Sequence, residues 1–296
     1  MKKQFVFISD IHITSKSNVR TGDYVDDIVK KLEFVVDYAN RNDAALLIGG
    51  DIFDKPSVPD FVKAAVGRVL IKASHPVYSI WGNHDKLWNA DEKDFKTSYN
   101  LLAELGVIRD LKTEDFGEFV LTSEKPLQTD GKPKLAMYHG FLNKEDKGWE
   151  VMLQDITTTD QAMVLLGHDH VQYEDVEFGP VRVIRPGSFT RVGREETNFR
   201  QPVLVHILVD TENDRVFRRK YVEIATARQF DTIFKEKEVS KTAADEASYN
   251  SIIQSLMAVT EQDMSFMQAV SSVASPETTE YIKTVLDEVK TDKDNK

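Results

Sequence analysis

The chain has 296 residues, 41% of them hydrophobic, which suffices for one large domain or for one domain with an appendage. Because it contains no cysteine, a disulfide framework and a thiolate metal site are both excluded. The formal net charge of −11 argues against a protein that coats nucleic acid through a basic surface, although bound cations can supply positive charge locally.

The sequence of the first half predicts alternating strands and helices. Apolar periodicity predicts strands at 3–8, 44–48 and 77–80 and helices at 23–41 and from about 60 to 72. Ser57-Val-Pro-Asp60 has the form of a capping box at the start of the second helix. This order predicts a layered α/β domain with parallel strands. The first apolar run is too short for a signal peptide, and no run reaches the roughly 20 residues that span a bilayer, so we predict a cytoplasmic protein with no membrane partner.

The remaining sequence predicts shorter strands and then a helical end. The strands are expected at 118–122, 134–138, 162–166, 172–178, 181–185, 202–209 and 215–224. Several are joined by turn-like segments, which favours a second and more antiparallel sheet. From about Arg228 the sequence is polar and helical, and Ser275-Pro276-Glu277 is typical of a helix start. We therefore expect an α/β domain over 1–225 and a helical region over 226–296.

Side chains with metal-binding chemistry follow five of the predicted strands. The segments are Asp10-Ile-His12, Gly50-Asp51, Trp81-Gly-Asn-His-Asp85, His139-Gly140 and Gly167-His-Asp-His170. Carboxyl ends of strands are where open α/β sheets build their sites. Imidazole and carboxylate together suit Mn²⁺, Zn²⁺ or Fe²⁺. In Asp10-x-His12 and His168-x-His170, an extended backbone would place both side chains on one face.

One such histidine is usually structural, and we interpret His75 and His206 in that way. Five groups in this order at strand ends are not expected by chance. Asp-x-His, Gly-Asp, Gly-Asn-His-Asp, His and Gly-His-x-His resemble, in this order, the calcineurin-like metallophosphoesterases over residues 5 to 195.

The resemblance implies a four-layer α/β/β/α sandwich, with two sheets face to face and helices outside. It implies two divalent metal ions that activate water for attack on a phosphoester. One ion would be held by Asp10, His12 and His170, the second by Asn83, His139 and His168, and Asp51 would bridge them.

Two further segments are similar to the SbcD-type DNA repair exonucleases, namely Gly50-Asp-Ile-Phe-Asp54 before Lys55-Pro56, and Arg185-Pro-Gly-Ser-Phe-Thr-Arg191. This similarity implies a Mn²⁺-dependent DNA exonuclease or endonuclease of repair or recombination. It also implies an SbcC-like coiled-coil ATPase partner gripped by the helical end, and a homodimer through the first helices. Since few residues follow Ile224, we expect the usual DNA-capping domain to be reduced or missing.

Roles follow for the remaining polar residues. We assign His84 to the phosphate or leaving group, because its neighbour Asn83 is already used as a ligand. Asp85 either orients His84 or His12 or is a structural turn aspartate. A basic stretch predicts phosphate contacts with DNA, with a solvated loop as the alternative reading, and its members are Arg20, Arg185, Arg191 and Arg194.

Two other functions remain open at this point. The same metal centre would serve a phosphodiesterase or phosphatase that acts on a small nucleotide or a phosphoprotein. A non-catalytic scaffold could also keep the fold, but such proteins can lose ligands without penalty, and here all seven ligand positions are filled.

Overall fold

The computed structural model describes residues 2–87, 96–144, 148–193, 199–213 and 215–235. They belong to one compact unit, Met1–Lys235. The helical region predicted beyond residue 235, with its helix start at Ser275 and the proposed partner grip, lies outside the described residues, as does Arg194. Among the residues described, no helix is both long and apolar enough to cross a bilayer.

The first sheet has six strands in the order β14-β13-β1-β2-β3-β4. Four of them pair in parallel, as the strand–helix alternation predicted: β1 (Lys2–Ile8), β2 (Ala44–Ile48), β3 (Val77–Ser79) and β4 (Arg109–Asp110). Two strands from late in the chain extend it in antiparallel pairing next to β1, namely β13 (Val203–Asp210) and β14 (Phe217–Glu223).

The second sheet has the order β11-β12-β10-β7-β6-β5. Its strands are β5 (Thr113–Asp115), β6 (Val120–Thr122), β7 (Lys134–His139), β10 (Ala162–Gly167), β11 (Val176–Phe178) and β12 (Val181–Ile184). The four inner strands pair in parallel, and only the two edge pairs are antiparallel. A small parallel pair, β8 (Phe141–Leu142) and β9 (Glu150–Val151), follows β7.

The prediction of a more antiparallel second sheet was therefore wrong. Turn-like linkers indicate hairpins, and hairpins do form at the sheet edges, but the linkers between the inner strands cross over. The strands predicted at 202–209 and 215–224 belong to the first sheet, because β13 returns to pair with β1. Such long-range pairing leaves no local signal in a sequence.

Five helices are described. They are α1 (Tyr24–Arg41), α2 (Asp60–Leu70), α3 (Ser98–Glu104), α4 (Leu153–Ile156) and α5 (Phe230–Ile233). The side chain of Asp23 caps α1 by accepting a hydrogen bond from the Asp26 amide. The capping box predicted at Ser57 is wrong, because the N-cap of α2 is Pro59, which provides no side-chain hydrogen bond. The amide of Val58 instead donates to Ser98 Oγ, which keeps this segment outside the helix.

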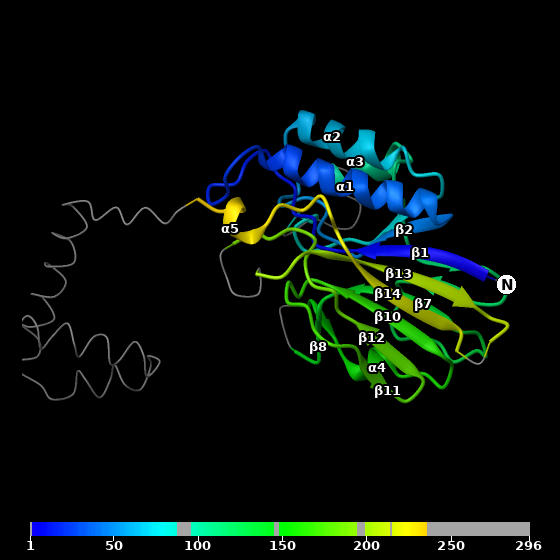
Figure 1. Cartoon of the computed structure of the whole chain (residues 1–296). Helices are drawn as coiled ribbons and strands as arrows, with labels where there is room; N and C mark the ends of the chain where they lie inside the picture. The colour runs from blue at the N-terminus through cyan, green and yellow to red at the C-terminus, as the bar shows by residue number, and fades with distance from the viewer. Residues whose placement is uncertain (1, 88–95, 145–147, 194–198, 214, 236–296) are drawn as a thin grey trace, which may run out of the picture. The chain divides into compact units, whose positions relative to one another are not determined.

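Alternating side chains sort the core into three apolar layers. Val6 and Ile8 of β1 pack against the helices, while Phe5 and Phe7 point the other way into the space between the sheets. The outer face of the second sheet is buried in a third cluster that includes Ile156 of α4. Figure 1 shows α1, α2 and α3 over the first sheet and α4 below the second. The predicted α/β sandwich is confirmed.

The last described segment returns to the loop that follows β1. Arg20 and Phe234 form an antiparallel β-bridge, and the amides of Thr21 and Lys235 donate to the carbonyls of Ile233 and Val19. In Figure 1 the yellow segment around α5 lies beside this blue loop. We call residues 228–235 the C-terminal clasp.

Replacing Phe7 should test the layer between the sheets. Phe7 is fully buried there, so Phe7→Ala should lower the free energy of unfolding by about 3–5 kcal/mol, measured by urea denaturation. The same change at Phe61, which is 56% exposed on α2, should alter stability by less than about 0.5 kcal/mol. Equal effects of the two substitutions would contradict this packing.

Candidate metal centre

The structure brings all seven predicted ligand residues to one end of the two sheets. The parallel strands β1, β2 and β3 end there, and so do β7 and β10 of the second sheet. The residues lie at the ends of these strands or in the segments that follow them: Asp10, His12, Asp51, Asn83, His139, His168 and His170. Three sets of donor atoms lie within 4.8 Å of one another: Asp10, His12 and His170; His12, Asp51 and His84; and Asp51, His139 and His168.

The first group joins the loop after β1 to the loop after β10. The Nε2 atoms of His12 and His170 lie 2.9 Å apart, and Asp10 Oδ1 lies 3.8 Å from each of them. The main chain of His168 also donates to both carboxylate oxygens of Asp10, at 3.0 and 3.1 Å. These bonds connect the two loops at the ligands themselves.

The second group gathers around an amide oxygen. Asn83 Oδ1 lies 3.0 Å from His139 Nε2 and 2.9 Å from His168 Nδ1. His139 Nδ1 donates to the carbonyl of Gly49 at 2.8 Å, so its Nε2 is the nitrogen free to bind a cation.

Asp51 stands between the two groups. Its Oδ2 lies 3.6 Å from His12 Nε2 and 3.3 Å from His139 Nε2. Its Oδ1 accepts a hydrogen bond of 2.8 Å from the main-chain amide of His84. One carboxylate therefore faces donor atoms of both groups.

Left-handed backbone brings these side chains together. The φ angles are 58° at Asp10, 47° at His12, 52° at Asp51 and 85° at His168. The sequence argument that two-residue alternation along an extended segment aligns Asp10 with His12 was therefore wrong, although the side chains do meet. Each such residue costs of order 1–3 kcal/mol and persists only where its surroundings fix it.

Two glycines leave the space that the cluster needs. A Cβ at Gly82 would overlap the Asp51 carboxylate, and a Cβ at Gly167 would overlap Ser9 Oγ and the Gly49 carbonyl. Both positions have ordinary φ angles, so close approach explains these glycines and turn conformation does not.

The electrostatics favour a negative Asp51. Burial acts to raise the pKa of Asp51, but the imidazoles of His139, His12 and His84 outweigh it and hold that pKa below its usual value. Burial acts to lower the pKa of His139, but Asp51 and Asp10 raise it to about 9. Burial lowers the pKa of His12 to about 4, which keeps this imidazole neutral and able to donate its lone pair.

The residues present fit divalent cations. Imidazole nitrogens, carboxylate oxygens and one amide oxygen converge, which is the donor chemistry of Mn²⁺, Zn²⁺ or Fe²⁺ sites. The facing Nε2 atoms of His12 and His170 have lone pairs that repel each other unless a proton or a cation lies between them. The donors also come in two groups with a shared carboxylate, an arrangement suited to two adjacent ions.

Asp85 lies outside this donor set. Its buried carboxylate accepts hydrogen bonds from three main-chain amides, those of Ile52, Phe53 and Gly82, at 3.2–3.3 Å. These bonds shape the turn that carries Asp51, in agreement with the structural reading of Asp85. Burial and the charge of Asp51 raise the pKa of Asp85 to about 7.

The residue beside the second nitrogen of His12 is Asp54, with Oδ1 3.8 Å from Nδ1. The Asp54 carbonyl also accepts a 2.8 Å hydrogen bond from His84 Nδ1. The sequence analysis gave Asp54 no role. Its only signal was a second carboxylate in Gly50-Asp-Ile-Phe-Asp54.

Two of the arginines predicted to contact DNA are buried. Arg20 is 4% exposed and donates to the Arg191 carbonyl and to Asp27. Arg191 is 3% exposed and donates to the Arg228 carbonyl. Their guanidinium groups tie loops together, so as predicted surface contacts they are corrected. Arg185 is partly exposed, and its guanidinium lies over the ring of Tyr173 at 4.2 Å from the ring centroid.

Comparisons with known proteins agree with this geometry. A family model described as calcineurin-like phosphoesterase matches residues 3–193. The DNA double-strand break repair protein Mre11 of Aeropyrum pernix is 41% identical over 83 residues, which are 26% of this chain and 20% of that protein. The chain thus aligns with only about a fifth of the length of this relative.

Three solved structures cover about three quarters of the chain. They are TT1561 of Thermus thermophilus (13% identity, TM-score 0.44, 76% of this chain and 100% of that one), a predicted phosphoesterase of Streptococcus pneumoniae TIGR4 (14%, 0.34, 75% and 99%) and Vacuolar Protein Sorting 29 of Cryptosporidium parvum (14%, 0.38, 75% and 97%).

Removing the Asp85 carboxylate should loosen the turn beneath Asp51. Asp85→Ala leaves three buried amides without an acceptor, so the free energy of unfolding should fall by at least about 2 kcal/mol in urea denaturation. Asp85→Asn keeps one acceptor oxygen and should cost less. Asp37→Ala, on the exposed face of α1, is the control and should change stability by less than about 0.5 kcal/mol. A neutral Asp85→Ala would show that the turn does not depend on these bonds.

Proposed function

Because the chain belongs to the calcineurin-like phosphoesterase family, a family of metal-dependent enzymes, we propose that it is an SbcD-like nuclease with two metal ions that hydrolyses phosphodiester bonds of DNA in repair or recombination. The observation that carries the proposal is the position of Asp51 between two groups of donors. A carboxylate there can serve two cations at once, as a phosphoester-cleaving centre requires.

In this proposal Asp51 is shared, and the other ligands divide as their contacts do. Asp10, His12 and His170 hold one ion, and Asn83, His139 and His168 hold the other. The oxygen and imidazole ligands favour Mn²⁺ among the ions that such a set accepts. Two bound cations supply a reactive water at neutral pH and positive charge for the phosphate oxygens.

His84 is proposed to contact the phosphate or the leaving oxygen. Its Nδ1 donates to the Asp54 carbonyl, which fixes the ring and leaves Nε2 for another partner. Its ring packs edge-on against that of His12, at 4.7 Å between centroids, so it stands beside the first donor group. A proton held on Nε2 would then lie where a departing oxygen can accept it.

DNA is preferred as the substrate on two grounds. The Mre11 relative, whose name describes double-strand break repair, is 41% identical over the aligned stretch. The segment Arg185 to Arg191 is similar to the repair nucleases. The Mn²⁺ preference, a cytoplasmic location, a homodimer and an SbcC-like ATPase partner stay predictions that accompany the proposal.

Mn²⁺-dependent digestion of linear duplex DNA is the direct test. The wild-type protein should degrade DNA with Mn²⁺ and not with EDTA, and Asp51→Asn should be inactive because the shared carboxylate is lost. Asn at this position keeps an oxygen for the His84 amide, so the fold should survive. Asp169→Asn, between two ligand histidines but outside the donor sets, is the matched control and should stay active.

Parallel assays with cyclic nucleotides and a generic phosphoester separate the alternatives. Hydrolysis of a small substrate with intact DNA would favour the small-molecule phosphodiesterase. Inactivity toward every substrate, with Mn²⁺ bound, would favour a scaffold.

His84→Ala should separate catalysis from metal binding. Turnover of DNA should fall by about 10²–10⁴-fold, the usual contribution of a general acid. Mn²⁺ at about 100 times its Kd should still raise the free energy of unfolding by about 2.7 kcal/mol, seen as a higher Tm. His84 also lies in one donor set with His12 and Asp51, so an equal loss of Mn²⁺ affinity would make it a ligand and refute the assigned role.

A further inference from the structure

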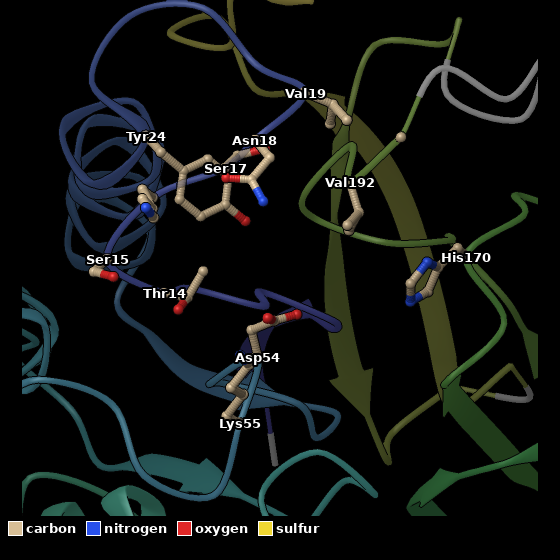
Figure 2. Close-up of a pocket in the computed structure, with 12 residues that line it drawn as sticks. Thr14, Ser15, Ser17, Asn18, Val19, Tyr24, Asp54, Lys55, His170 and Val192 are labelled. Carbon is tan, nitrogen blue, oxygen red and sulfur yellow. The ribbon is translucent and has the colours of Figure 1, made fainter. Parts of the chain in front are cut away.

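A polar pocket of about 790 Å³ opens beside His170. Its walls come from the loop after β1, from Asp54 and Lys55 after β2, and from Val192 and Gly193 after β12. In Figure 2, Tyr24 and Asn18 lie on one side of the pocket, Val192 and His170 lie on the other, and Asp54 and Lys55 lie at one end. None of these neighbours of the pocket except His170 belongs to the proposed ligand set.

The pocket is joined to the first donor group by direct contacts. Tyr24, which lines it, donates its hydroxyl hydrogen to the His12 carbonyl at 2.8 Å. Asp54 Oδ1 lies 3.8 Å from His12 Nδ1, and His170 contributes its ring to both the pocket and the donor group. A phosphodiester whose phosphorus lies at the metal centre would therefore extend one of its two substituents into this pocket.

The lining has the chemistry to bind that substituent when it is a nucleotide. Lys16 and Lys55 are exposed lining residues, and neither forms an ion pair with any residue that the structure describes. Hydroxyl groups of Thr14, Ser15 and Ser17 and the amide of Asn18 offer donors and acceptors to a sugar or a base. Asp54 is an acid among these lining residues, so the free lysines supply the positive charge that a phosphate needs.

The size of the pocket narrows the ligand further. A volume of 790 Å³ lies in the upper part of the range for pockets that enclose a small organic molecule, and it is far larger than one phosphate needs. Loops also wall the pocket on three sides, so one strand fits where a stacked duplex would not.

We infer that this pocket binds a nucleotide of a single DNA strand next to the scissile phosphate, with Lys16 and Lys55 contacting the neighbouring phosphate. The inference rests on the proposed function and deepens it, because it makes the substrate a polynucleotide strand. A small phosphodiester without a flanking nucleotide would leave the pocket unused.

Binding without cleavage tests the inference separately from the proposed function. The probe is a fluorescein-labelled pentathymidylate, titrated in EDTA and followed by fluorescence anisotropy at several salt concentrations. The double variant Lys16→Met/Lys55→Met should raise Kd at least tenfold. Loss of two phosphate contacts should also flatten the dependence of log Kd on log salt by about 1.4, at about 0.7 per contact for single strands.

Two further variants make the result specific. Lys2→Met/Lys132→Met removes the same charge at the opposite end of β1 and β7, and it should match the wild type in affinity and salt dependence. Val192→Trp fills the pocket without changing charge, so Kd should rise while the salt dependence stays the same.

The outcomes distinguish the two claims. Pentathymidylate binding that depends on Lys16 and Lys55, in a protein that cleaves no DNA, supports the pocket and refutes the nuclease. DNA cleavage by a protein whose Lys16→Met/Lys55→Met variant binds like the Lys2→Met/Lys132→Met control overturns the pocket alone. Lack of pentathymidylate binding by the wild type also overturns the pocket.

Discussion

The side chains of the candidate metal centre come from two different sheets, and they can meet only if the sheets stay in register at one end. The hydrogen bond from His139 Nδ1 to the Gly49 carbonyl crosses this boundary at 2.8 Å. Gly49 also accepts from Ser9 Oγ, so one carbonyl joins the ends of β1, β2 and β7. Separation of the sheets by even one ångström would open the distance between Asp51 and His139, which is now 3.3 Å. The apolar layer between the sheets thus sets the geometry of the polar site.

The site is energetically unfavourable by itself, and the fold supports it. Four residues of the donor set have positive φ angles, and two aspartates and two of the histidines are almost completely buried. Burial of these charges is tolerable because Asp51 faces imidazoles and Asp10 accepts main-chain hydrogen bonds from His168. Asp85 holds the turn under Asp51 in the same way, through three main-chain amides. Backbone strain and buried charge are common where a protein prepares a site for a ligand.

Much of this could be predicted from the sequence, because the information was local. Apolar runs ending in aspartate or histidine located β1, β2, β7 and β10 and the residues that follow them. Pairing between distant segments was not local, and so the return of β13 to β1 was missed. Charge alone could not tell a surface arginine from one that ties loops together, as Arg20 and Arg191 do. The left-handed conformation of Asp10 and His12 was also invisible, since neither residue type demands it.

The C-terminal clasp has a mechanical consequence. Residues 19–21, which it holds through two main-chain hydrogen bonds, belong to the loop that carries Val19 of the pocket wall. Arg228 strengthens the attachment by donating to the carbonyls of Thr21 and Thr232. Tension applied to the chain at Lys235 would therefore load this loop before it loads either sheet, and the first structure to yield would be the entrance to the pocket.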